Sequence, residues 1–144
     1  MNLTAEQAWN VCGYVRLSRE DGDKDESNSV TGQKDLIRDY LSRHPELREC
    51  GMKVDDGYTG SNFDRPAFHE MMAEVKAGKI NCIVVKDLSR FGRNHLGVGE
   101  YLEQLFPFLG VRFIAINDHY DTLHSNVESD ELVIPFKNLI NEAY

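Results

Sequence analysis

Four arginines and one serine stand near the places where this sequence predicts strands to end and loops to begin. Ser18 closes the stretch YVRLS, and Arg16 stands two residues before it. Arg65 lies in SNFDRPAF, while Arg90 and Arg93 lie in VVKDLSRFGRN. Guanidinium groups stay charged and present a planar fork of donors that matches phosphate oxygens two at a time. These residue types therefore predict chemistry on a phosphate group.

A serine in the field of several arginines can act as a nucleophile. Positive charge favours the alkoxide of Ser18, and donors fixed before the reaction stabilise the charge that builds on a phosphate in the transition state. No histidine stands close in sequence to serve as its base, so proton removal is unassigned. Each residue alone has a plainer interpretation, because a serine after a strand is usually a turn residue and a lone arginine is usually solvated. Together they favour a phosphate-handling site.

The apolar pattern predicts the elements that must position these residues. Strands are expected at residues 11–15, 52–58, 82–85 and 111–116, and helices at about 30–44, 66–78 and 98–109. This alternation predicts an α/β fold, an open and mostly parallel sheet with helices on both faces. Loops that leave the carboxyl ends of such strands gather at one edge, where ligands bind. Ser18, Arg65, Arg90 and Arg93 are therefore expected to converge.

The chain of 144 residues fits one domain, but its net charge of −8 argues against a domain that grips duplex DNA unaided. The charge is sorted along the chain. Residues 20–26 hold five acids and one base, whereas residues 86–93 hold three bases and one acid. The sum therefore conceals a local basic spot.

Several classes of function are disfavoured by what the sequence lacks. No zinc, calcium or phosphate-loop spacing is complete, so no metal and no cofactor are expected. No stretch approaches the length of a membrane span, and the first residues do not read as a secretory signal. Three cysteines without a CxxC spacing fit a reducing compartment. We expect a cytoplasmic protein with no membrane partner.

The C-terminal segment carries an apolar stripe from Leu132 to Ile140, which predicts a helix. Neither glycine nor proline ends this pattern before Tyr144, which suggests a chain cut from a longer protein. The stripe would pack either on the core of its own chain or on a partner helix, and the sequence leaves both open.

Three motifs in order, YVRLS, DDGYTGSNFDRPAF and VVKDLSRFGRN, resemble the catalytic domain of serine recombinases, the resolvase/invertase superfamily. The segment DGYTGSNFDRP and the continuation from HYDTLHS to the end look most like the large serine recombinases of mobile and conjugative transposons. The resemblance implies a resolvase-like fold. It divides the chain into an N-terminal extension (1–10), a catalytic domain (11–127) and the start of a long C-terminal oligomerisation helix (128–144).

The resemblance also implies a role for each candidate residue. Ser18 matches the nucleophile that attacks double-stranded DNA, forming a 5′-phosphoserine link and freeing a 3′ hydroxyl without metal or ATP. Gln33 matches a supporting polar residue. The residues that match phosphate-binding and transition-state positions are Arg16, Arg65, Arg90 and Arg93.

One position departs from the family pattern. Much of the family has an aspartate directly before the first arginine of the last motif, where this chain has Ser89. Asp87 stands two residues earlier. Either Asp87 reaches the site from a shifted position or its role is filled otherwise, and we keep it as a candidate.

The resemblance implies a site-specific recombinase that excises or integrates a mobile element. Its partners would be DNA at the recombination sites and further copies of the chain, as a homodimer and as a tetramer in the synaptic complex. In the family, later domains read the DNA sequence, which makes an acidic catalytic domain tolerable. Two alternatives remain open, a non-catalytic flavodoxin-like module that docks a phosphate or an acidic partner, and a small-molecule phosphatase or nucleotide hydrolase.

Overall fold

A five-stranded sheet runs through the centre of the computed structural model, which describes residues 8–19 and 26–124. The strand order is β2-β1-β3-β4-β5; the first four strands are parallel, and β5 runs antiparallel to β4. The strands are β1 (Trp9–Leu17), β2 (Leu47–Asp56), β3 (Cys82–Val85), β4 (Arg112–Ala115) and β5 (Tyr120–Asp121).

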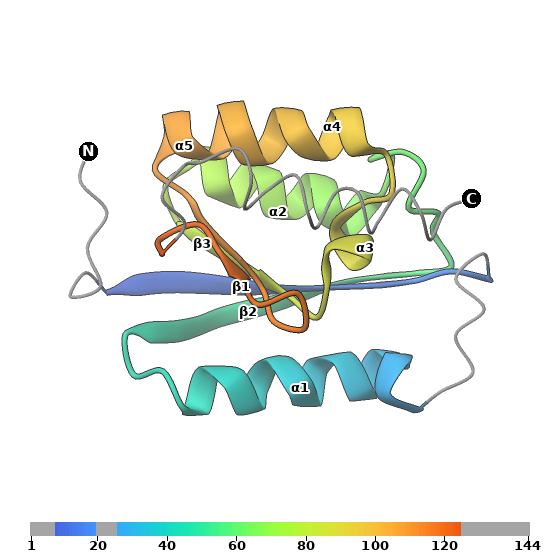
Figure 1. The fold of residues 1–144 in the computed structure, drawn as a ribbon, viewed down its shortest axis with the longest axis horizontal. Coiled ribbons are helices and arrows are strands. Elements are labelled where there is room, and N and C mark those ends of the chain that lie inside the picture. The colour runs from blue at the N-terminus through green and yellow to red at the C-terminus, as the bar shows by residue number, and fades with distance from the viewer. Residues whose placement is uncertain (1–7, 20–25, 125–144) are drawn as a thin grey trace.

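Helices cover both faces of this sheet (Figure 1). Helix α1 (Val30–Ser42) lies on one face, and α2 (Pro66–Lys76) lies on the other with α4 (His95–Gly99) and α5 (Phe106–Leu109). A short helix, α3 (Leu88–Phe91), follows β3 directly. The predicted fold class, an open and mostly parallel α/β sheet with helices on both faces, is confirmed. The predicted C-terminal helix and most of the acidic segment lie outside the described residues.

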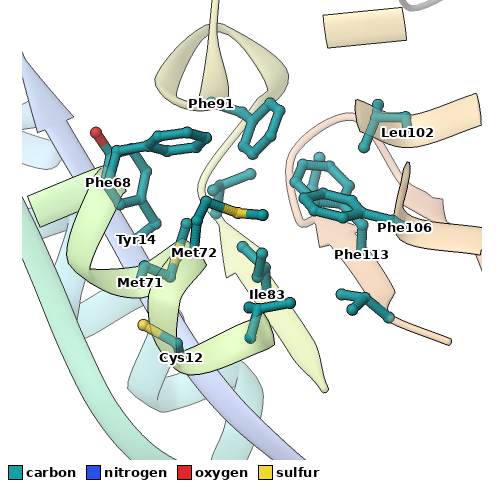
Figure 2. Close-up of a cluster of buried hydrophobic side chains, with 14 of the residues drawn as sticks. Cys12, Tyr14, Phe68, Met71, Met72, Ile83, Phe91, Leu102, Phe106 and Phe113 are labelled. Atoms are coloured by element: carbon teal, nitrogen blue, oxygen red, sulfur yellow. The ribbon is translucent and has the colours of Figure 1, made fainter. Parts of the chain in front are cut away.

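The side chains of each strand alternate between two hydrophobic cores. On β1, Cys12 and Tyr14 pack under α2, whereas Val11 and Val15 pack against α1. This period of two is the pleat of a strand whose two faces are both covered. Figure 2 shows the core under α2, whose large members include Phe68, Met71, Phe91, Phe106 and Phe113.

Local signals account for several helix boundaries. Ser29 caps α1, because its Oγ accepts a hydrogen bond from the amide of Gly32 at 3.0 Å. Pro66 occupies the first turn of α2, where its missing N–H breaks no helical bond. Gly110 ends α5 with a φ of 72°, a left-handed conformation that glycine adopts without strain.

The helix predicted at 98–109 is three consecutive pieces, since a π-helical segment, η3 (Glu100–Leu105), joins α4 to α5. Pro107 lies two residues after the end of this segment. Proline cannot donate a hydrogen bond to the preceding turn, and its ring crowds the carbonyl there, which accounts for the widened backbone.

Two strands also differ from what the sequence predicted. Strand β2 begins five residues before the predicted 52, and β5 was not predicted because two residues show no periodicity.

Candidate active site

Ser18 follows the last residue of β1, at the carboxyl end of the parallel strands. Its Oγ accepts a hydrogen bond from Nη1 of Arg16 at 3.2 Å. Ser18 is 8% exposed, so the hydroxyl lies at the base of the strand-end loops rather than on an open turn. A guanidinium that donates to a serine oxygen favours its ionised form, because hydrogen bonds to a charged form stabilise it.

Arg16 is completely buried and is held by main-chain carbonyls from two other segments. Its Nε donates to the carbonyl of Arg90 at 3.3 Å, and its Nη2 donates to the carbonyl of Ser89. Its Nη1 also donates to the carbonyl of Tyr58 at 3.1 Å. The guanidinium of Arg16 therefore ties the end of β1 to the loop after β2 and to α3.

Gly60 and Arg93 complete this side of the site. A Cβ atom on Gly60 would lie 2.7 Å from Nη2 of Arg16 and 3.0 Å from Cγ of Arg93, so only glycine fits between the two arginines. The amide of Arg93 donates to the carbonyl of Gly60 at 2.7 Å. Arg93 itself is half-buried.

Arg90 and Gln33 reach the same point from α3 and α1. Arg90 is 3% exposed, and its Nη1 donates to the carbonyl of Arg16 at 3.4 Å. Gln33 is buried, and its Nε2 donates to that same carbonyl at 3.0 Å and to the carbonyl of Asn28 at 2.8 Å. Gln33 thereby positions the backbone of β1 directly before Ser18.

Asn28 and Lys86 belong to this cluster and were not predicted from the sequence. Asn28 lies in the 3₁₀ turn η2 (Glu26–Asn28), and its Oδ1 accepts from Nη2 of Arg90 at 3.3 Å and from Nζ of Lys86. Lys86 follows β3 and is buried. Lys86 could have been predicted as a site residue, because it lies in the basic segment 86–93. Asn28 is a polar residue next to an acidic loop, and nothing in the sequence around it indicates a place in the site.

Asp87 lies beside the site and contacts the residue at the family's usual aspartate position. Its Oδ1 accepts a hydrogen bond from Oγ of Ser89, and its Oδ2 lies 3.8 Å from Nε of Arg90. Asp87 is therefore bound to two residues of the last motif. It forms an ion pair with Arg90 and accepts a hydrogen bond from Ser89.

Arg65 lies in different surroundings from the other arginines. It is completely buried, its Nε donates to the carbonyl of Asn62 at 3.0 Å, and its Nη1 donates to the hydroxyl of Tyr14 at 3.1 Å. Its guanidinium carbon lies 4.8 Å from the ring centre of Phe63 and 5.5 Å from that of Phe68. Direct hydrogen bonds thus join Arg16 to Ser18, Gln33 and Arg90, whereas those of Arg65 go to Asn62 and Tyr14.

Burial shapes the titration of the site's tyrosine. It raises the pKa of Tyr14 well above its ordinary value, while the nearby Arg65 guanidinium lowers that pKa by a smaller amount. The hydroxyl of Tyr14 therefore keeps its proton at neutral pH.

Among residues 8–19 and 26–124, no three His, Cys, Asp or Glu side chains lie together as a metal site requires, and no helix there is long and apolar enough to cross a membrane.

The fold and the site define an open α/β domain with a serine and buried arginines at the carboxyl ends of its parallel strands. The sequence profile of the resolvase N-terminal domain matches residues 11–144. The chain belongs to this family, which confirms the predicted resemblance to the resolvase/invertase superfamily.

Individual relatives agree with this assignment. The transposon Tn917 resolvase of Enterococcus faecalis is 29% identical over 112 residues, covering 78% of this chain and 52% of that protein. The chain thus spans about half the length of this curated relative.

Solved structures share the fold. The N-terminal catalytic domain of TP901-1 integrase is 24% identical with a TM-score of 0.73, covering 93% of this chain and 95% of that one. A resolvase family site-specific recombinase from Streptococcus pneumoniae is 25% identical with a TM-score of 0.69, covering 94% of this chain and 91% of that one.

Proposed function

We propose that this chain is the catalytic domain of a site-specific serine recombinase of the large type and that Ser18 is its nucleophile. The observation that carries the proposal is the hydrogen bond from Arg16 to Oγ of Ser18, made by a guanidinium that three main-chain carbonyls hold in place. A turn serine needs no such partner. A serine that must attack a phosphodiester gains from a fixed cation at its oxygen.

The reaction is a transfer of one phosphodiester bond to the protein and back to DNA. Oγ of Ser18 loses its proton and attacks the phosphorus of a DNA strand, and the bond from phosphorus to the 3′ oxygen breaks. The products are a 5′-phosphoserine link and a 3′ hydroxyl that carries a proton. Attack by the 3′ hydroxyl of a partner strand reverses these steps, releases Ser18 and rejoins the DNA without an external energy source.

The arginines supply positive charge for this transfer. Arg16 donates to Ser18, and Arg90 donates to the main-chain carbonyl of Arg16. Both guanidinium groups would stabilise the charge that builds on the phosphate oxygens. Arg93 is the more exposed member of the set and would meet the DNA backbone. Arg16 and Arg65 are 0% exposed, so a phosphate reaches their guanidinium groups only after the strand-end loops move.

The partners follow from the same proposal. The substrate is double-stranded DNA at the ends of a mobile element, and the working assembly is a dimer that pairs into a tetramer so that four strands are cut together. Because the chain carries a net charge of −8, sequence reading and most DNA affinity would come from other parts of the full protein.

The test is a search for a covalent protein–DNA adduct that survives denaturant. The protein, in the longest form that its gene encodes, is mixed with a duplex carrying the junction of the element that encodes it. We expect an adduct at a 5′ end with the wild type and none with Ser18→Ala. Ser42→Ala is the control, because Ser42 is exposed on α1 and, within the described part of the chain, its hydroxyl bonds only to the carbonyl of Asp39.

The adduct experiment distinguishes a recombinase from a module that only binds phosphate. Adduct formation by the wild type and by Ser42→Ala, but not by Ser18→Ala, supports the proposal. Tight DNA binding with no adduct in any of the three proteins contradicts it and favours a module that only docks phosphate.

A further inference from the structure

The guanidinium of Arg65 has two anchored nitrogens and one that is not anchored. Nε is bound by the carbonyl of Asn62 and Nη1 by the hydroxyl of Tyr14. Nη2 is buried and has no hydrogen-bond partner among the described residues. A buried donor of a charged group is costly to leave unpaired, so native structures rarely retain one without a use for it.

Tyr14 is itself held by a buried carboxylate. Its hydroxyl donates to Oδ2 of Asp55 at 2.7 Å. The two oxygens of Asp55 also accept the amides of Ala67 and Phe68, both at 2.9 Å, in the first turn of α2. Asp55 is buried, and the positive end of the helix stabilises its charge.

Each hydrogen bond from Arg65 through Tyr14 to Asp55 has a defined donor and acceptor. A neutral tyrosine has one hydroxyl proton, and the short contact to the carboxylate of Asp55 directs that proton toward Oδ2. The lone pairs of the oxygen then face Nη1 of Arg65. The first turn of α2 thus orients Asp55, Asp55 orients the hydroxyl of Tyr14, and the hydroxyl fixes one end of the guanidinium.

Aromatic rings restrict the rest of the Arg65 side chain. The ring of Phe63 lies over the guanidinium, and a Cβ on Gly92 or on Gly97 would come within 2.8 Å of that ring. Phe63 is therefore seated closely on the segment that follows Arg90. With Nε and Nη1 engaged, Nη2 is the nitrogen of Arg65 that remains for an incoming oxygen.

We propose that Tyr14 and Asp55 are positioning residues for Arg65, which fix its Nη1 so that Nη2 is the donor presented to a DNA phosphate once Phe63 moves aside. The proposal rests on the proposed function and deepens it. It assigns to the Tyr14–Asp55 pair a task that acts through Arg65, which the Tyr14 hydroxyl binds directly and which Asp55 reaches through that hydroxyl.

The first test needs no DNA. Rotation of the Arg65 guanidinium about its Nε–Cζ bond is measured by ¹⁵N NMR in the wild type and in Tyr14→Phe, with the signals assigned by their loss in Arg65→Lys. Losing one hydrogen bond to a charged group should speed this rotation by about tenfold or more. Equal rotation rates in the wild type and in Tyr14→Phe would overturn the proposal.

Two further variants sharpen this measurement. Asp55→Asn leaves one acceptor oxygen for the three donors that the two carboxylate oxygens of Asp55 bind. The hydroxyl of Tyr14 is then held less firmly, so the rotation should again be faster. Tyr40→Phe makes the same chemical change on the other face of the sheet, where the hydroxyl has no hydrogen bond to a described residue. It should leave the rotation unchanged.

The second test is a double-mutant cycle on the rate of adduct formation. Tyr14→Phe should slow cleavage by about 100-fold, the cost of a misplaced group, while the DNA concentration at half-saturation stays unchanged. In an Arg65→Ala background the same substitution should cost nothing further, because its effect passes through Arg65. An equal loss in both backgrounds would mean that Tyr14 acts on the fold, which refutes a positioning role.

Failure of this proposal and failure of the proposed function give different results. If the wild type forms no adduct, the recombinase assignment fails and the NMR comparison alone decides whether Tyr14 holds Arg65. If the wild type forms an adduct but Tyr14→Phe cleaves at the wild-type rate, only the positioning role is lost.

Discussion

At the scale of single residues, the side chain of Arg16 combines two tasks that only arginine can perform together. Its Nη1 reaches Ser18, and its three nitrogens also bind carbonyls from the loop after β2 and from α3. Lysine has three donors on one nitrogen and could not span these positions. The residue that donates a hydrogen bond to the serine oxygen is therefore also the one that holds the strand-end loops together.

Gly60 is the residue-scale test of this arrangement. In Gly60→Ala the added methyl would lie 2.7 Å from Nη2 of Arg16, and the hydrogen bonds of that guanidinium prevent an easy retreat. We expect adduct formation to slow by about 100-fold, as for a catalytic group displaced by about an ångström. The rate is measured on the junction duplex under single-turnover conditions.

Gly51→Ala is the matched control for this substitution. A Cβ at Gly51 meets no atom within 4 Å, so the variant should cleave like the wild type. Wild-type cleavage by Gly60→Ala would show that Arg16 need not hold its observed position.

At the scale of elements, two helices are capped by aspartates that lie far from them in the sequence. The residues that directly precede these helices make no capping hydrogen bond of their own. Arg65 and Asp87 precede α2 and α3, and neither side chain makes a capping hydrogen bond. Asp55 accepts from the first turn of α2, and Asp118 accepts from the amide of Leu88 at 2.7 Å at the start of α3. Both helices that begin in the site are thereby fixed to strand ends.

The edge strand β5 is attached by a buried ion pair. Arg112 on β4 is almost fully buried and binds Asp121 on β5 through two hydrogen bonds, at 3.0 and 2.7 Å. Asp121→Ala leaves this guanidinium uncompensated, and removing one partner of a buried pair costs about 3–5 kcal/mol. We expect a loss of that size in the free energy of unfolding, measured by urea denaturation.

An exposed pair on α1 provides the comparison. Arg43 and Asp39 lie 3.0 Å apart, with more than half of each side chain exposed. Asp39→Ala should lower the free energy of unfolding by at most about 0.5 kcal/mol. Equal losses in the two variants would contradict the structural role assigned to the pair on β5.

At the scale of the whole molecule, the two cores on either side of the sheet bury two of the three cysteines. Burial raises the pKa of Cys12 to about 12 and raises that of Cys82 further, whereas Cys50 is exposed. Because the thiolate is the reactive form, the two buried thiols should be inert in the folded protein.

Thiol reactivity therefore reports on the integrity of both cores at once. With a disulfide reagent at pH 8, we expect Cys50 to react immediately and Cys12 and Cys82 to react only as the protein unfolds in urea. Cys50→Ser should abolish the fast phase alone. A second fast thiol in the native protein would mean that one face of the sheet opens without global unfolding.

The sequence alone determined the fold class and the identity of the candidate residues. Apolar runs such as Cys82–Val85 and the spacing along 66–78 predicted their elements correctly because period and burial are local properties. The three motifs indicated the family, and its profile confirmed it. Ser18 and its neighbouring Arg16 could be selected because both stand at one strand end.

Tertiary structure decided which of these residues meet. Arg65 was expected to converge with Ser18 at the strand ends. The structure adds which partners its guanidinium has, namely Asn62 and Tyr14, in a loop before α2 that packs into an aromatic cluster. Asn28 binds Arg90 in the site, although nothing in the sequence predicted this contact. Contacts such as that between Tyr14 and Asp55 join residues 41 positions apart, and no local pattern encodes them. Residue type and spacing define what a side chain can do, while the packing of distant segments defines which partner it has.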